Sequence, residues 1–173
     1  MPKKILVATD GSETGGRALA FASEISSKIG GDLTIVHVLM HGKPAEDLTR
    51  LAQVEHVIDT KVRPIIPNEL NMPVDLRKIL SHPEVDQARA VAEIGDYVIH
   101  NARRAAEEAG ARNVQTMLED GDYADAILDV ASDLGVDLIV MGRRGLGRIS
   151  SVVLGSVSNK VLQHADCDVA VVR

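Results

Sequence analysis

Glycine, serine and arginine residues gather between positions 142 and 158, where their spacing could hold a phosphate group. The segment reads Gly142-Arg143-Arg144-Gly145, then nine further residues, then Gly155-Ser156-Val157-Ser158. Glycines allow backbone N–H groups to approach an anion closely, and the N–H groups at a helix start carry partial positive charge. Ser156 and Ser158 could add hydroxyl donors, and three arginines could add positive charge: Arg143, Arg144 and Arg148. We therefore predict a phosphate-binding loop, with an ordinary strand-loop-helix connection as the alternative.

A carboxylate lies in a second short loop, Thr9-Asp10-Gly11-Ser12, directly after an apolar run at 5–8. A carboxylate beside phosphates is understandable chiefly through a divalent cation, because Mg²⁺ is held by one or two carboxylates together with phosphate oxygens. Asp10 is therefore predicted to bind Mg²⁺, and the alternative is a turn or capping residue before the first helix. Two glycines follow at 15 and 16, inside the predicted helix, which suggests that another group lies close to its backbone.

The familiar nucleotide motifs and catalytic groups do not occur in the chain. No Gly-x-x-x-x-Gly-Lys-Ser/Thr sequence is present, and Gly145-x-Gly147 is followed by Ser150 where the dinucleotide fingerprint requires glycine. The six histidines show no metal-ligand spacing, so we interpret His37 as a packing or surface residue and Cys167 as a small buried one. No residue is an evident general base for hydrolysis, so no catalytic residue is predicted.

Composition places the chain among ordinary globular proteins and disfavours some partners. A chain of 173 residues has the length of a single domain, and its 45% hydrophobic and 25% charged residues are typical of a globular protein. A net charge of −6 and only three aromatic residues argue against a nucleic-acid partner. One cysteine cannot form an internal disulfide, which favours the cytoplasm. We expect no membrane insertion, because no apolar run is long enough to span a bilayer.

Apolar runs and helical periodicity alternate along the chain. The runs predict strands at 5–8, 33–39, 113–118, 137–141 and 168–173, and the periodicity predicts helices at 12–29, 83–109, 122–134 and 156–164. This alternation predicts an α/β fold with an open five-stranded parallel sheet and helices on both faces. With strand order 3-2-1-4-5, the loops after strands one and four would border one ligand-binding cleft. In the long second helix, we predict an apolar face of Val91, Gly95, Val98, Ala102, Ala105 and Ala109.

Residues 40–83 interrupt the alternation and hold five of the six prolines. Pro44 could open a short helix, and the chain from Pro64 to Pro73 should be irregular. A connection this long is unusual in a compact domain and suggests a lid or an interaction arm. We predict a single domain over residues 1–173 that carries this proline-rich, partly helical insertion.

The loop spacing resembles that of the universal stress proteins. Their ATP-binding members carry Gly-x-x-Gly, nine residues and then Gly-Ser/Thr, which this chain matches with Gly142, Gly145, Gly155 and Ser156. Asp10-Gly11-Ser12 and the valine-rich C-terminal strand are also similar, and the resemblance covers roughly residues 1 to 40 and 85 to 173. It departs from the family at Asp168, where proline is common, at Asn159, where Glu is common, and in the length of 41–84.

The resemblance implies an adenine nucleotide α hydrolase-like fold and a set of binding residues. Ala8 and Asp10 would border the nucleotide, and Val38 would meet adenine. Ribose and phosphates would be held by Met141, Gly142, Gly145, Gly155, Ser156, Val157 and Ser158. We include Thr9 and Arg143 from the same two loops. The resemblance also implies a homodimer, commonly through the last strand, residues 168–173, and an apolar edge strand independently favours pairing.

Three functional hypotheses follow from these observations. In the first, ATP, or AMP or ADP, binds with Mg²⁺ and biases a regulatory homodimer that an unknown protein partner senses. In the second, the protein is a slow ATPase or nucleotidyl transferase of the same architecture. In the third, it is a nucleotide-free module that binds proteins through residues 40–83.

Overall fold

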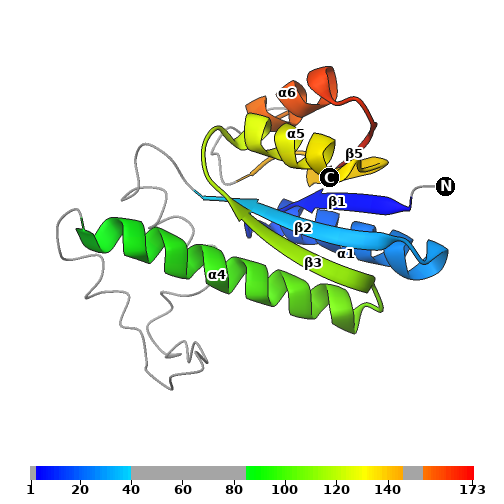
Figure 1. The fold of residues 1–173 in the computed structure, drawn as a ribbon, viewed down its shortest axis with the longest axis horizontal. Helices are drawn as coiled ribbons and strands as arrows, with labels where there is room; N and C mark the ends of the chain where they lie inside the picture. Colours follow the sequence, from blue (N-terminus) through cyan, green and yellow to red (C-terminus); the bar gives the residue numbers. More distant parts are fainter. Residues whose placement is uncertain (1–2, 40–84, 146–153) are drawn as a thin grey trace.

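A computed structural model of the protein describes residues 3–39, 85–145 and 154–173. They form one open sheet of five parallel strands in the order β3-β2-β1-β4-β5 (Figure 1). The strands are β1 (Lys4–Ala8), β2 (Asp32–Val38), β3 (Arg112–Glu119), β4 (Leu138–Gly142) and β5 (Asp168–Val172). The predicted fold class and strand order are confirmed, and the predicted strand ends differ from these bounds by single residues.

Four helices in the described chain cover the sheet: α1 (Glu13–Ile29), α4 (Val85–Glu108), α5 (Tyr123–Leu134) and α6 (Ser156–His164). Helices α1 and α4 lie on one face, and α5 and α6 lie together on the other (Figure 1). Because every crossover carries a helix, the central strands are buried on both sides, which explains why they are mostly aliphatic. This layered arrangement brings the carboxyl ends of β1 and β4 together at one edge of the sheet.

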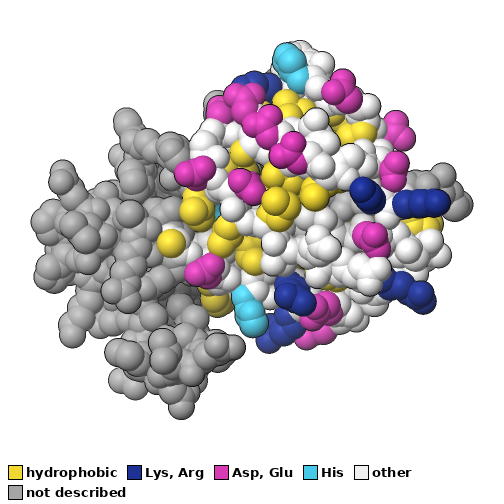
Figure 2. Space-filling view, viewed as in Figure 1, with side chains coloured by type: hydrophobic (Ala, Val, Ile, Leu, Met, Phe, Trp, Pro, Cys, Tyr) yellow, Lys and Arg dark blue, Asp and Glu magenta, His cyan; other side chains and the backbone are white. Residues whose placement is uncertain are grey.

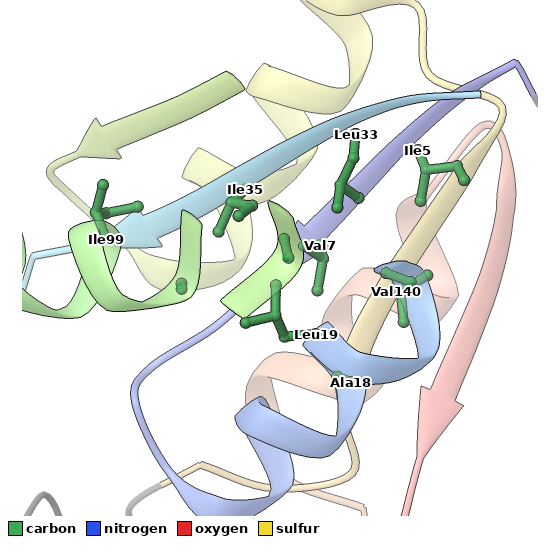
Figure 3. Packing of buried hydrophobic residues seen from close by; sticks show 11 residues of the cluster. Ile5, Val7, Ala18, Leu19, Leu33, Ile35, Ile99 and Val140 are labelled. Carbon is green, nitrogen blue, oxygen red and sulfur yellow. The ribbon is translucent and has the colours of Figure 1, made fainter. Parts of the chain in front are cut away.

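Alternate side chains of each strand enter two separate cores. In β1, Ile5 and Val7 pack toward α1 and α4, while Leu6 packs toward α5 and α6. Figure 3 shows the first core, in which strand residues of β1, β2 and β4 meet Ala18 and Leu19 of α1. Burying each large aliphatic side chain contributes about 1.5–3 kcal/mol, so these two cores are the main support of the site at the strand ends.

The helix ends follow from local sequence. Ser12 caps α1 by accepting a hydrogen bond from the N–H of Gly15 at 3.1 Å, and Asp122 caps α5 in the same way. Gly30 ends α1 in the left-handed conformation, with φ of 70°, which costs glycine no steric strain. Both N-terminal caps therefore also fix how the chain leaves β1 and β3.

The predicted apolar face of α4 is partly wrong. Ala105 and Ala109 are exposed, whereas Ile99 and Ala106 are buried beside Ala102. Successive helix residues are about 100° apart, so a face that contains Ile99 and Ala106 turns Ala105 away from the sheet. Ala109 lies beyond the last residue of the helix.

Several predictions concern residues outside the described ranges. They include the helix at Pro44, the lid or arm at 40–83, and the charge of Arg148. The single-domain organisation with an insertion therefore stays a prediction. A membrane-spanning helix, long and apolar enough to cross a bilayer, is not found among the residues that the structure describes.

Candidate functional site

The candidate site lies where the order of strands reverses. Strands β1 and β4 are adjacent, and Ala8 pairs with Met141 at their carboxyl ends. Helix α1 leaves β1 toward one face of the sheet, and α6 follows β4 on the other (Figure 1). In open parallel sheets this divergence leaves room for a ligand between the two loops. The structure therefore brings together the two loops that the sequence singled out.

The first loop, residues 9–12, is called here the β1 turn, and side-chain hydrogen bonds hold it. Oδ1 of Asp10 accepts from the backbone N–H of Ser12 at 3.0 Å and from its hydroxyl at 2.6 Å. Oγ1 of Thr9 accepts from the N–H of Gly11 at 3.3 Å. Asp10 thus makes a local turn with Ser12 while it stands at the end of β1, so the predicted turn role and the predicted metal role are compatible.

Two glycines let the carboxylate of Asp10 lie close to the backbone on both sides. A Cβ on Gly15 would come within 2.8 Å of Oδ1 of Asp10 and 2.9 Å of the Thr9 hydroxyl oxygen. A Cβ on Gly145 would overlap Oδ2 of Asp10. In contrast, a Cβ on Gly16 would meet nothing within 4 Å. Of the two helix glycines, only Gly15 is explained by a group close to its backbone.

The second loop, called here the β4 loop, comprises residues 142–155, of which 142–145 and 154–155 are described. The N–H of Arg143 donates to the carbonyl of Val172 at 2.7 Å, and the N–H of Gly155 donates to the carbonyl of Arg143 at 3.0 Å. The first bond ties the start of the loop to the end of β5, and the second ties the end of the loop to its start. Backbone hydrogen bonds therefore fix the two ends relative to each other.

The β4 loop also contacts the first turn of α1. The hydroxyl of Thr14 donates to the carbonyl of Arg144. A Cβ on Gly142 would lie 2.9–3.0 Å from the backbone carbonyl group of Thr14 and 3.1 Å from the carbonyl oxygen of Arg144. The absence of a side chain at Gly142 is thus a steric requirement of the packing between β4 and α1.

Helix α6 begins at the candidate site. Gly155 is its N-cap in extended conformation, and among the described residues no side chain caps it. The first N–H groups of such a helix start attract anions. Ser156 is exposed and Val157 half-buried, whereas Ser158 is only 3% exposed. The hydroxyl of Ser158 donates to the carbonyls of Gly142 at 3.0 Å and Arg143 at 3.3 Å, so its oxygen supports the loop from behind.

Apolar residues predicted for the site are placed at the ends of the strands. Val38 is the last residue of β2 and Met141 lies near the end of β4, and both belong to the core beneath α5. Ala8 packs against the same core. Of the arginines, Arg143 and Arg144 are half-buried. The structure thus places every described residue of the predicted site at or beside the carboxyl ends of the strands.

Among the described residues, Asp10 is the carboxylate that approaches the β4 loop, through Gly145, and it could hold a bound Mg²⁺ there. Across residues 3–39, 85–145 and 154–173, no three His, Cys, Asp or Glu side chains are grouped as a metal site would require. Asp10 with nucleotide phosphate oxygens is nevertheless a donor set that Mg²⁺ accepts, because this ion commonly keeps waters and binds few protein ligands. The described residues therefore fit a nucleotide-bound cation, and among them no set fits a metal held by protein alone.

Sequence reasoning missed the contributions of two residues to the site. Thr14 acts through the contact just described, and His37 was interpreted as packing or surface. Its Nδ1 lies 2.8 Å from the carbonyl oxygen of Thr9, and the side chain is buried. The spacing of Asp10 and Ser12 could have indicated their hydrogen bonds, because aspartate commonly bonds the backbone two residues on. The contacts of Thr14 and His37 join distant parts of the sequence.

The fold and site define an open α/β protein whose loops meet at the reversal of strand order. A sequence model of the universal stress protein family matches residues 1–173, and the chain belongs to this family. It is 34% identical over 178 residues to universal stress protein YxiE of Bacillus subtilis (strain 168), covering 100% of both chains.

Solved structures share the fold. A universal stress protein in complex with cAMP superposes with a TM-score of 0.62 at 22% identity, covering 99% of this chain and 97% of that one. The universal stress protein from Archaeoglobus fulgidus in complex with dAMP gives a TM-score of 0.59 at 21% identity, covering 98% of this chain and 97% of that one. The predicted family and fold are therefore confirmed.

Proposed function

We propose that the protein binds ATP with Mg²⁺ at the carboxyl ends of β1 and β4, and that it acts as a nucleotide-responsive regulatory homodimer. The observation that carries this proposal is the approach of Gly145 to the carboxylate of Asp10. It brings the predicted metal ligand and the predicted phosphate loop within contact of each other. AMP or ADP would occupy the same place with fewer phosphates.

Each part of a nucleotide has a counterpart among the described residues. Val38, Ala8 and Met141 offer an apolar rim at the strand ends for adenine. The backbone of Gly142 and Gly145 can approach phosphates closely, because neither residue carries a side chain. The N–H groups at Ser156 and Val157 and the half-buried Arg143 would supply partial and full positive charge.

Two solved relatives support an adenine nucleotide as the ligand class. One universal stress protein forms a complex with cAMP and another with dAMP, and both ligands are adenine nucleotides. A triphosphate with Mg²⁺ suits this chain better than a monophosphate, since Arg143 and Arg144 belong to the same loop as Gly145, which approaches Asp10. The cation would offset the repulsion between Asp10 and the phosphates.

The link from the site to a dimer passes through β5. The N–H of Arg143 donates to the carbonyl of Val172, which is the last residue of β5. In the described sheet β5 pairs only with β4, so its other edge is available for a second copy of residues 168–173. A phosphate that orders Arg143 would therefore stabilise the strand through which we propose dimerisation.

The surface charge fits a cytoplasmic protein that does not bind nucleic acid. Figure 2 shows Asp and Glu side chains gathered over the part of the surface where α5 lies. On α5 these include the exposed residues Asp125, Asp129 and Asp133. A polyanion would be repelled from this face. The partner that senses the nucleotide state is accordingly proposed to be a protein.

Calorimetric titration with ATP, in the presence and absence of Mg²⁺, tests the binding proposal. We expect binding that Mg²⁺ strengthens, and an affinity loss of roughly tenfold or more in Gly145→Ala, because the new Cβ displaces Asp10. The matched control is Gly16→Ala, where the Cβ meets nothing within 4 Å and binding should be unchanged. Absence of heat at about millimolar ATP would contradict the proposal and favour the nucleotide-free module.

Two further measurements separate the regulatory protein from an enzyme. Freshly purified protein, denatured and analysed by mass spectrometry, should release an adenine nucleotide. Phosphate release above the buffer rate that disappears in Asp10→Asn would instead favour the slow ATPase. Sedimentation should show a dimer whose dissociation constant falls when ATP and Mg²⁺ are added, and a monomer under all conditions would contradict the regulatory part.

A further inference from the structure

The imidazole of His37 occupies an unusual place at the end of β2. The residue is 4% exposed, and its Nδ1 lies 2.8 Å from the carbonyl oxygen of Thr9. A carbonyl only accepts hydrogen bonds, so Nδ1 must carry the proton. A buried histidine that is satisfied by a backbone carbonyl could simply be part of the core. The acceptor, however, is the carbonyl of Thr9 in the β1 turn, which indicates that His37 also supports the candidate site.

Thr9 is the residue at which β1 separates from β2. The two strands pair from Lys4 opposite Asp32 to Ala8 opposite Val36, and the N–H of Thr9 adds one last bond to the carbonyl of Val36 at 3.0 Å. The next acceptor on the β1 side is the carbonyl of Thr9, and it takes the imidazole of His37. A side chain of β2 therefore continues the connection between the strands where their regular pairing ends.

This connection stands one residue before Asp10. Upstream, His37 fixes the Thr9 carbonyl, and downstream, Ser12 holds Oδ1 of Asp10 through two hydrogen bonds. The peptide that carries Asp10 is thus held from both sides. A rotation of the Thr9–Asp10 peptide would move the carboxylate relative to Gly145, which lies in contact with it.

Helix α4 confines the imidazole from the side away from Thr9. A Cβ on Gly95 would lie 3.6 Å from Cδ2 of His37 and 2.5 Å from Cδ2 of Leu39. The helix therefore comes close to β2 at the position of the ring and limits its rotation. The ring is held by packing on one side and by a hydrogen bond on the other, as expected for a residue that supports a binding group.

We propose that His37 is a positioning residue that sets the orientation of the Asp10 carboxylate for a nucleotide-bound divalent cation. The proposal rests on the proposed nucleotide site, to which it adds a residue that does not touch the ligand. Its role is to hold the Thr9 carbonyl, so it acts on the cation-dependent part of binding. The adenine and phosphate contacts elsewhere would be untouched.

Two substitutions separate a positioning role from packing. His37→Asn keeps an N–H donor close to the place of Nδ1 but loses ring volume, whereas His37→Leu keeps apolar bulk and loses the donor. We expect His37→Leu to bind ATP about tenfold more weakly than the parent with Mg²⁺ and equally without it. His37→Asn should keep most of the Mg²⁺ enhancement. Equal losses with and without Mg²⁺, or a greater loss in His37→Asn, would overturn the proposal.

Amide hydrogen exchange provides a test that does not depend on nucleotide. In His37→Leu the Gly11 and Ser12 amides, which bond Thr9 and Asp10, should exchange faster, while the Gly30 amide at the other end of α1 should keep its rate. Unchanged exchange at Ser12 would overturn the positioning role even if ATP binds. Parent protein that fails to bind ATP but shows this exchange pattern would remove the proposed function and leave the link from His37 to the β1 turn standing.

Discussion

The two sides of the candidate site are built in opposite ways. In the β1 turn, side chains make the contacts: Ser12 bonds the carboxylate of Asp10, and His37 bonds the carbonyl of Thr9. In the β4 loop, backbone groups make two of the ties: the N–H of Arg143 donates to the carbonyl of Val172, and the N–H of Gly155 donates to the carbonyl of Arg143. The β1 turn therefore depends mainly on hydrogen-bonding side chains. The β4 loop depends mainly on the lack of a side chain at Gly142 and Gly145, which lets other atoms approach the backbone.

This difference separates the effects that substitutions should have. On the β1 side, removal of a donor or acceptor should change the site even where volume is conserved. On the β4 side, an added methyl group should be harmful even where no hydrogen bond changes. Two hydroxyls are exceptions: that of Thr14 donates to the carbonyl of Arg144, and the buried one of Ser158 supports the β4 loop from α6. Substitutions at Gly142, Ser158 and His37 therefore test the comparison.

The largest effect is expected for Gly142→Ala. The new Cβ would meet backbone atoms of Thr14 and Arg144 at 2.9–3.1 Å, and backbone yields less readily than a flexible side chain. We expect a loss of about 2–3 kcal/mol in the free energy of unfolding, at the upper end of overpacking costs. Urea denaturation measures it.

Gly155→Ala is the matched control for Gly142→Ala. Its φ of −64° suits any residue, and the nearest atom to its Cβ is 3.5 Å away, which is ordinary contact. Its unfolding free energy should stay within about 0.5 kcal/mol of the parent. Equal destabilisation by the two substitutions would show that volume at particular positions does not govern the β4 loop.

An intermediate effect is expected for Ser158→Ala. The substitution removes a donor from the carbonyls of Gly142 and Arg143 in a buried place. The loss should be about 1–1.5 kcal/mol in unfolding free energy, the net value of a hydrogen bond. Ser156→Ala, two residues earlier and exposed, should leave stability nearly unchanged. If Ser156→Ala were the more destabilising, the α6 start would be structural and not a ligand surface.

The sequence predicted the parts of the site that depend on local order. The parallel sheet with helices on both faces followed from the alternation of strands and helices, because parallel crossovers allow few arrangements, and the meeting of the two loops followed once the order 3-2-1-4-5 was assumed. The glycine spacing predicted the β4 loop, since absent side chains at Gly142 and Gly145 are visible in the sequence itself. The family resemblance was carried by the spacing of the same glycines, and the match of the family model to residues 1–173 confirms it.

Contacts between distant segments could not be predicted in this way. His37 meets Thr9 across 28 residues, and Thr14 meets Arg144 across 130. That Ser158 holds ribose or phosphate stays a prediction, but the bonds from its hydroxyl in α6 to the carbonyls of Gly142 and Arg143 were not foreseen. Helical periodicity gives the direction of a side chain only to within one residue in either direction, and the error at Ala105 in α4 has the same origin.

The smallest effect concerns pH, and it should arise on the β1 side. Burial lowers the pKa of His37 from 6.5, opposed by its bond to the Thr9 carbonyl and by the charge of Asp10. The unfolded chain therefore binds a proton more readily than the folded one just below pH 6.5. Stability that is fully present above pH 6.5 should then decline as the pH falls below it.

At pH 6.0 the loss relative to pH 7.5 should be at most about 1 kcal/mol, and it should be absent in His37→Asn. Carboxylates such as Asp122 and Asp137, whose pKa values are lowered by backbone N–H groups, titrate below pH 3.8 and do not interfere in this range. Urea denaturation of both proteins at pH 7.5 and 6.0 measures the difference. An identical pH dependence in parent and variant would mean that the imidazole of His37 is not buried as a neutral group. The β1 turn would then have no titratable group that sets it apart from the β4 loop in this pH range.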